Sequence, residues 1–166
     1  MRFTYSFTAS IFTVLWLTVP VFAEPSSIER LKTIQRLLTT YECQACDLSE
    51  ANLSEADLSE SDLQGANLQG ANLQDANLRG AILSGANLIG ANLEGANLSG
   101  AILHGTTMRQ ANLKNVDLSW ADLYQAYMEE AKLNGANLSN ANLNQAKLDQ
   151  TDLCGATLPD GKKRDC

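Results

Sequence analysis

Four cysteines are the residues of this 166-residue chain best suited to chemistry, and they lie in two pairs. Cys43 and Cys46 are spaced as C-x-x-C, whereas Cys154 precedes Cys166 by twelve residues. Such cysteines can form structural disulfides, exchange disulfides with another protein, or supply zinc ligands. Four cysteines allow three full pairings, so the spacing alone leaves the chemistry open.

A single histidine and a run of carboxylates are the other reactive groups. His104 has no recognisable nucleophile motif around it, so we expect a solvated side chain rather than a general base. Seven carboxylates without any Lys or Arg lie in residues 42–62, namely Glu42, Asp47, Glu50, Glu55, Asp57, Glu60 and Asp62. This acidic end could bind a cation weakly or attract a basic partner, but we expect it mainly to keep molecules apart by repulsion. We therefore predict no enzyme, no cofactor and no metal site.

The first element of the chain is expected to be an export signal. Arg2 precedes a mostly apolar run, residues 11–22, which ends in Val21-Phe22-Ala23. This order is typical of a signal peptide cleaved after Ala23, and the run is shorter than the roughly 20 residues that span a bilayer. We interpret residues 1–23 as a signal peptide rather than a membrane anchor, with no stable membrane insertion after cleavage.

The chain carries a formal net charge of -7, which argues against nucleic acid or anionic lipid as a partner. Residues 24–45 are predicted to be a helix and a linker. Apolar residues recur there every three or four positions, which makes one apolar stripe: Ile28, Leu31, Ile34, Leu37, Leu38 and Tyr41. We expect this stripe to cap one end of the main domain rather than to lie on a membrane.

A strict period of five residues organises the rest of the chain. From Leu48 to Leu158, 21 of 23 central positions are Leu and the other two are Met108 and Met128. The residue two positions earlier is Ala in 18 cases, and the residue between is Asn or Asp in 16. Neither a helix, at 3.6 residues per turn, nor a flat strand, with alternating side chains, buries a five-residue repeat on one face. The chain must therefore turn after each quintet, where ten of the eleven glycines lie, and wind into a solenoid.

Quintets such as Ala66-Asn67-Leu68-Gln69-Gly70 resemble the A-[ND]-L-x-x signature of pentapeptide repeat proteins, in phase over residues 46–158. The resemblance implies an all-β fold, a right-handed quadrilateral β-helix with four quintets per coil and the Leu and small residues inside. Met108, Met128, Val116 and Thr106 are expected to disturb this core locally. Residues 159–166 would form a C-terminal tail or cap, which looks too polar to dimerise by burial alone.

On such a rod, with coils about 4.8 Å apart, the cysteines of the two ends are too distant to bond. Disulfides need Cα atoms roughly 4.4 to 6.8 Å apart, so the expected pairs are Cys43 with Cys46 and Cys154 with Cys166. Cys46 lies at an inward position of the first quintet, which favours a structural disulfide over a redox site. Paired cysteines fit an oxidising compartment such as a periplasm, and the frequency of this family in cyanobacteria adds a thylakoid lumen as the alternative location.

Outward apolar residues suggest where a partner would bind. With four quintets per coil, one side of the rod carries Ile82, Ile102, His104, Trp120 and Tyr124, a candidate protein-contact face. Scattered exposure without function remains the alternative. We predict a rigid, exported scaffold for an unidentified protein partner, either monomer or homodimer. Some relatives are acidic rods that mimic DNA at gyrase, but residues 63–116 hold two acidic and three basic residues, which disfavours that alternative.

Overall fold

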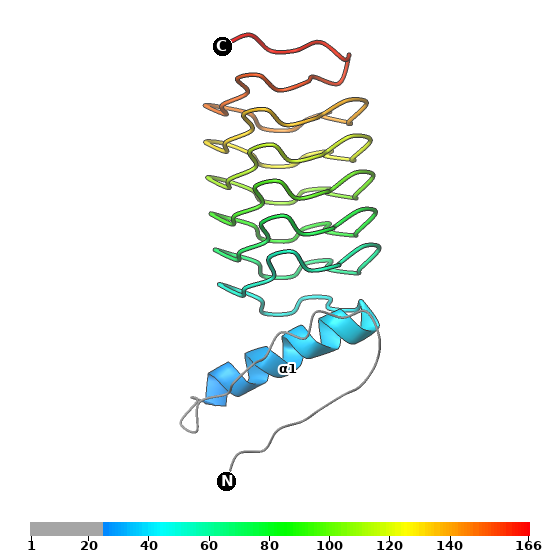
Figure 1. Ribbon diagram of the computed structural model, residues 1–166, viewed down its shortest axis with the longest axis vertical. Helices are drawn as coiled ribbons and strands as arrows, with labels where there is room; N and C mark the ends of the chain where they lie inside the picture. Colours follow the sequence, from blue (N-terminus) through cyan, green and yellow to red (C-terminus); the bar gives the residue numbers. More distant parts are fainter. Residues whose placement is uncertain (1–24) are drawn as a thin grey trace.

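The computed structural model describes residues 25–166, and the predicted signal peptide, residues 1–23, lies outside the described residues. The described chain has one helix, α1 (Pro25–Thr40), followed by a column of stacked coils that ends at the C-terminus (Figure 1). No helix among the described residues is long and apolar enough to cross a membrane. The order of a helix followed by a repeat solenoid agrees with the sequence prediction.

Each coil of the column contains four quintets. Parallel backbone bridges join each quintet to the equivalent quintet of the next coil, from Glu42 with Asp62 to Asn137 with Thr157. The last two residues of each quintet form a turn, so each coil has four short sides. The prediction of an all-β chain needs one qualification, because each side is too short to hold a strand. The sides are joined by isolated bridges in place of continuous strands.

The corners of the coil explain the glycines. The residue two positions after each central residue from Leu48 to Leu153 adopts a positive φ, as at Gly95 (φ 71°) and Trp120 (φ 60°). Glycine reaches this left-handed region without a steric penalty, whereas other residues are strained there. The predicted corner position is therefore confirmed, and non-glycine corners such as Trp120 cost stability that their side chains must offset.

The core consists of the central and small residues of each quintet. Every central residue from Leu48 to Leu138 is at most 2% exposed, and Met108 and Met128 are fully buried. Thr106 is also fully buried, and its hydroxyl donates to the carbonyl of Leu83 at 2.8 Å. The expected local disturbance is wrong here, because this bond satisfies the polar group and the bridges continue unbroken through the neighbouring Thr107.

Asn and Asp side chains stabilise the turns and tie the coils together. The side-chain oxygen of Asn72 accepts the backbone N–H of Gln74 and a bond from the side chain of Asn92, one coil later. Asn92 accepts in turn from Asn112 at 2.9 Å. Because these residues hydrogen-bond to nearby backbone more readily than others, the frequent Asn or Asp beside each Leu has a structural cause.

The two ends of the column differ. At the N-terminal end α1 covers the first coil, where Leu37 is fully buried and Ile34 is partly buried against the core. The predicted apolar stripe docks only in part, because α1 tilts away from the coil toward its N-terminus (Figure 1). Ile28, Leu38 and Tyr41 remain 41%, 38% and 37% exposed.

At the C-terminal end only a short tail covers the last coil. Thr157 pairs with Lys163 in an antiparallel bridge, and the N–H of Arg164 donates to the carbonyl of Ala156 at 2.8 Å. Leu143, Leu148 and Leu153 of this coil are only half-buried, unlike the leucines of the other coils. The tail therefore covers one side of the last coil and leaves the others open.

Candidate protein-contact face

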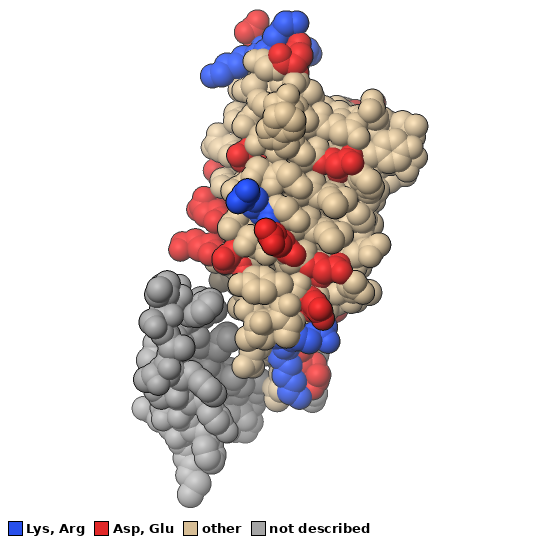
Figure 2. Space-filling view, turned by 90° about the vertical axis from the view of Figure 1, so that its right-hand side faces the viewer, with Lys and Arg blue, Asp and Glu red and all other residues tan. Residues whose placement is uncertain are grey.

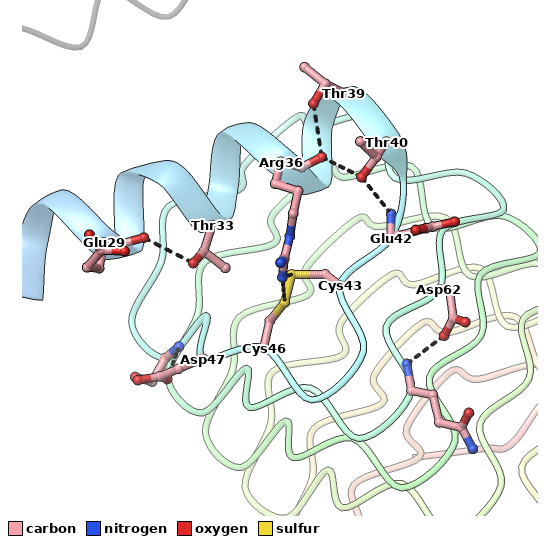
Figure 3. Close-up of a disulfide and its surroundings, with 12 residues drawn as sticks. Glu29, Thr33, Arg36, Thr39, Thr40, Glu42, Cys43, Cys46, Asp47 and Asp62 are labelled. Carbon is pink, nitrogen blue, oxygen red and sulfur yellow. Dashed lines mark hydrogen bonds between the residues drawn. A yellow bond between two sulfur atoms is a disulfide. The ribbon is translucent and has the colours of Figure 1, made fainter.

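The cysteines form two disulfides, one at each end of the column. Cys43 is bonded to Cys46 and Cys154 to Cys166, with Cα atoms 5.3 and 4.7 Å apart. Figure 3 shows Arg36 reaching from α1 onto the first disulfide, where its guanidinium lies 2.8 Å from the sulfur of Cys46. The N-terminal disulfide is thus buried at the start of the first coil. It connects two residues that both follow α1, and Arg36 is the helix side chain that contacts it.

The acidic end uses several of its carboxylates in the rod itself. Asp47 accepts bonds from Ser49 and from the side chain of Asn67, and Asp57 accepts bonds from Ser59. The hydrogen bonds from Ser49 hold the pKa of Asp47 below its ordinary value. Glu42, Glu50, Glu55 and Glu60 are exposed and Asp62 is half-buried. Among residues 25–166, no three His, Cys, Asp or Glu side chains are grouped to hold a metal ion.

The structure brings the predicted contact residues onto one side of the rod, which we call the contact face: Ile82, Ile102, His104, Trp120 and Tyr124. Ile82 and Ile102 pair directly across adjacent coils. The rings of His104 and Tyr124 meet edge to face, with centroids 5.9 Å apart. Because the backbone bridges fix these positions, the side chains form a stable surface and do not depend on a loop for their placement.

Trp120 is the most exposed large apolar residue that the structure describes, at 70%. It stands at a corner with φ of 60°, a conformation unfavourable for a bulky residue. Other corners of the same column hold Gly80 and Gly100. Neither backbone conformation nor core packing explains an indole at this position. On the face drawn in Figure 2, uncharged side chains make up most of the surface between the two ends.

Sequence reasoning did not include Asp122, which lies beside Ile102 and His104 of the contact face. Its position follows from the period, since it lies one coil after Ile102 and pairs with it. Nε2 of His104 donates to Oδ2 of Asp122 at 2.6 Å. This hydrogen bond is the largest of the effects that hold the pKa of Asp122 below its ordinary value. The pair links two successive coils across the contact face.

The lowered pKa of Asp122 predicts a loss of stability in acid. A carboxylate with a depressed folded-state pKa stabilises the fold above its unfolded pKa of about 4, and this contribution disappears as the pH falls through the lower value. The Tm difference between wild type and Asp122→Asn should therefore be largest above pH 5 and fade toward pH 2. Because both side chains are over a third exposed, we expect no more than about 2 °C.

Thermal melts between pH 7 and pH 2 measure this difference, and the double variant His104→Ala/Asp122→Asn supplies the control. If the pair is the cause, the two substitutions should be clearly non-additive at pH 7. A Tm difference that stays constant from pH 7 to pH 2 would contradict the assignment.

A second exposed aromatic residue, Tyr127, lies on a different side of the rod. Sequence reasoning missed it because it does not stack with Ile82 and Ile102. It is 38% exposed, and the guanidinium of Arg109 lies 5.5 Å from its ring centroid. Arg109 also makes two bonds to Glu129, both at 3.1 Å. Tyr127 is thus already paired within the chain, whereas Trp120 has no such partner among residues 25–166.

Comparisons with known proteins agree with this geometry. The family model for pentapeptide repeats, in eight copies, matches residues 46–85, 81–119 and 121–158. A pentapeptide repeat protein from the cyanobacterium Cyanothece 51142 is 30% identical with a TM-score of 0.54, over 74% of this chain and 93% of that one. HetL, involved in heterocyst differentiation regulation in the cyanobacterium Nostoc sp. strain PCC 7120, is 30% identical with a TM-score of 0.40, over 74% and 76%.

A third solved structure, a pentapeptide repeat protein from the Arabidopsis thaliana thylakoid lumen, is 26% identical with a TM-score of 0.28, over 75% of this chain and 70% of that one. No curated protein matches the chain. The family match covers more than half of the residues and coincides with the coils of four quintets. The chain therefore belongs to the pentapeptide repeat family.

Proposed function

We propose that this protein is an exported, non-enzymatic scaffold that binds a protein partner through the contact face. The scaffold is the right-handed quadrilateral β-helix that the family resemblance implies. The observation that carries the proposal is Trp120, which is 70% exposed at a corner where glycine would be less strained. Exposed tryptophan is among the residues that contribute most to protein interfaces, and Ile102, which is 38% exposed, adds further apolar surface to the contact face.

The surroundings of Trp120 support a protein partner over a small ligand. The contact face is a flat side of a rod, and its apolar side chains are flanked by the hydrogen-bonded pair of His104 and Asp122. An apolar centre beside polar groups is the usual arrangement of a protein interface. The protein acts by presenting a fixed binding surface to its partner, since the stacked coils hold the five side chains in place without any change of conformation.

Export to a periplasm or a thylakoid lumen is part of the proposal. It rests on the signal-like order of residues 1–23 and on the pairing of all four cysteines, which disulfide formation in an oxidising compartment explains. The DNA-mimic and cation-binding alternatives draw no support from the charges. Residues 63–116 are nearly neutral, and the carboxylates of Asp47 and Asp57 bond within the rod.

The proposal predicts that Ile102→Ser/Trp120→Ser loses its partner while the rod stays folded. The tagged protein is cross-linked to its neighbours in the compartment of its own host to which it is exported, and the captured proteins are compared by mass spectrometry. The captured amount of at least one partner should fall about tenfold or more, because the interface loses its central aromatic residue. Tyr127→Ser is the matched control, since it removes an exposed aromatic from a different side and should keep the partner. Equal capture by both variants would refute the contact face.

A further inference from the structure

The C-terminal end of the rod is an uncovered surface. Leu143, Leu148 and Leu153 are only half-buried there. The backbone N–H groups of the same three residues have no backbone partner among residues 25–166. In every earlier coil the corresponding N–H donates to a carbonyl of the next coil, as from Leu123 to Asn142. The stack therefore stops with its apolar interior partly open.

A second uncovered apolar surface lies at the opposite end of the same molecule, on α1. Leu37 faces the rod and is fully buried, whereas Ile28 and Leu38 are 41% and 38% exposed. At 100° per residue, Ile28 lies on the side of the helix opposite Leu37, and Leu31 and Leu38 lie next to it. The helix thus has one apolar side on its own rod and, away from it, a narrower strip of apolar residues that Gln35 interrupts.

The N-terminal end shows how a helix covers an open coil. In the first coil, which α1 covers, Leu48, Leu53 and Leu58 are at most 2% exposed. The equivalent leucines of the last coil lack such a helix and are half-buried. The same kind of surface is therefore covered by α1 at one end and left open at the other, which Figure 1 shows as a helix beneath the stack and none above it.

The charges determine which ends can meet. Two N-terminal ends would bring together two acidic sets of seven carboxylates in residues 42–62, which repel. α1 carries Glu29 against three basic residues. Residues 141–166 are balanced, with four acidic and four basic side chains. Lys32 pairs with Glu29 and Arg36 lies on the disulfide, so the outer side of α1 can approach the balanced C-terminal end without strong repulsion.

We propose that two copies of this chain associate head to tail, with the outer side of α1 in one copy covering the open last coil of the other. Ile28, Leu31 and Leu38 of the first copy pack on Leu143, Leu148 and Leu153 of the second. Because the two surfaces differ, the contact is heterologous and leaves one free surface at each end of the pair. Association then continues into longer rods at high concentration. This inference does not depend on the contact face.

Sedimentation of four versions tests the proposal. The full chain is expressed with export into an oxidising compartment, and its mass is measured between about 10 µM and 1 mM. The helix variant is Ile28→Asp/Leu38→Asp, which changes only exposed residues of the rod's cap. The end variant is Leu148→Gln, with circular dichroism to verify that the rod is intact. Ile102→Asp, on the contact face, is the matched control.

We expect the mass of the wild type and of Ile102→Asp to rise continuously with concentration. The helix variant and the end variant should each remain monomeric up to a concentration at least tenfold higher than that at which the wild type begins to associate. Mixing the helix variant with the end variant should give a heterodimer that grows no further, because each supplies one intact surface. A monomeric wild type at 1 mM would overturn the proposal. So would a closed dimer that the end variant abolishes and the helix variant leaves unchanged, since that result indicates pairing of two C-terminal ends. If Leu148→Gln is unfolded, the helix variant alone decides between these outcomes.

Discussion

Replacing Leu98 with alanine should lower the free energy of unfolding by about 3 kcal/mol, within the range measured for buried leucines. Leu98 is fully buried near the middle of the rod, with a leucine one coil away on either side at Leu78 and Leu118. The coils are fixed by bridges above and below, so they cannot collapse into the cavity. In a solenoid each coil contacts only its neighbours, and a cavity in the middle weakens both interfaces.

Leu148→Ala is the matched control for this prediction. It removes the same atoms from the same position of a quintet, but Leu148 is only half-buried in the open last coil. We expect it to cost less than half as much, because less of its surface leaves water on folding. Chemical denaturation at pH 7 measures both changes. Equal losses from the two variants would contradict the description of the C-terminal end as open.

Removing the C-terminal disulfide by Cys154→Ser/Cys166→Ser should release the tail from the last coil. The two cysteines are separated by 12 positions in the sequence, and a cross-link that closes a loop of this size contributes about 3 kcal/mol by restricting the unfolded segment. The effect should be local, because terminal coils of a solenoid open without the rest. Exchange at the amides of Leu158 and Arg164, whose bonds to Lys162 and Ala156 hold the tail, should accelerate about a hundredfold.

Hydrogen exchange read by mass spectrometry separates this local effect from a global one. The amide of Leu98, bonded to Asp117 at 2.7 Å in the middle of the rod, should keep its wild-type rate. Asp165→Ser provides the control within the same tail, since it changes a neighbouring side chain and leaves the cross-link intact. Unchanged exchange at Arg164 in the cysteine variant would show that the backbone bonds alone hold the tail.

The sequence predicted the interior of the rod well, because each position there obeys one strong constraint. Leucine every fifth residue can be buried only if the chain turns every fifth residue, and the glycines that follow mark the turns. The positive φ at Gly95 and at Trp120 confirms this reasoning. The expected disturbance at Thr106 is wrong, because its hydroxyl donates to the carbonyl of Leu83 in the preceding coil, a partner that no local sequence pattern reveals.

The ends were harder to predict, because they depend on how two unlike surfaces meet. The apolar stripe of α1 showed which residues could be buried but gave no angle between helix and coil, so Ile28 and Leu38 were expected to pack and are exposed. On the contact face, the period predicted the pairing of Ile82 with Ile102. It equally placed Asp122 in that column, but its bond to His104 depends on side-chain conformations that spacing does not determine.

The uninterrupted register of the coils makes the direction of the binding surface a matter of counting. Inserting one quintet between α1 and Ala81 would move every later residue onto the next side and turn the contact face by a quarter of a revolution relative to the helix. Inserting four quintets would return the contact face to its original direction around the axis and move it one coil farther from the helix. The number of quintets therefore sets where a bound protein would sit around the rod, independently of the side chains that hold it.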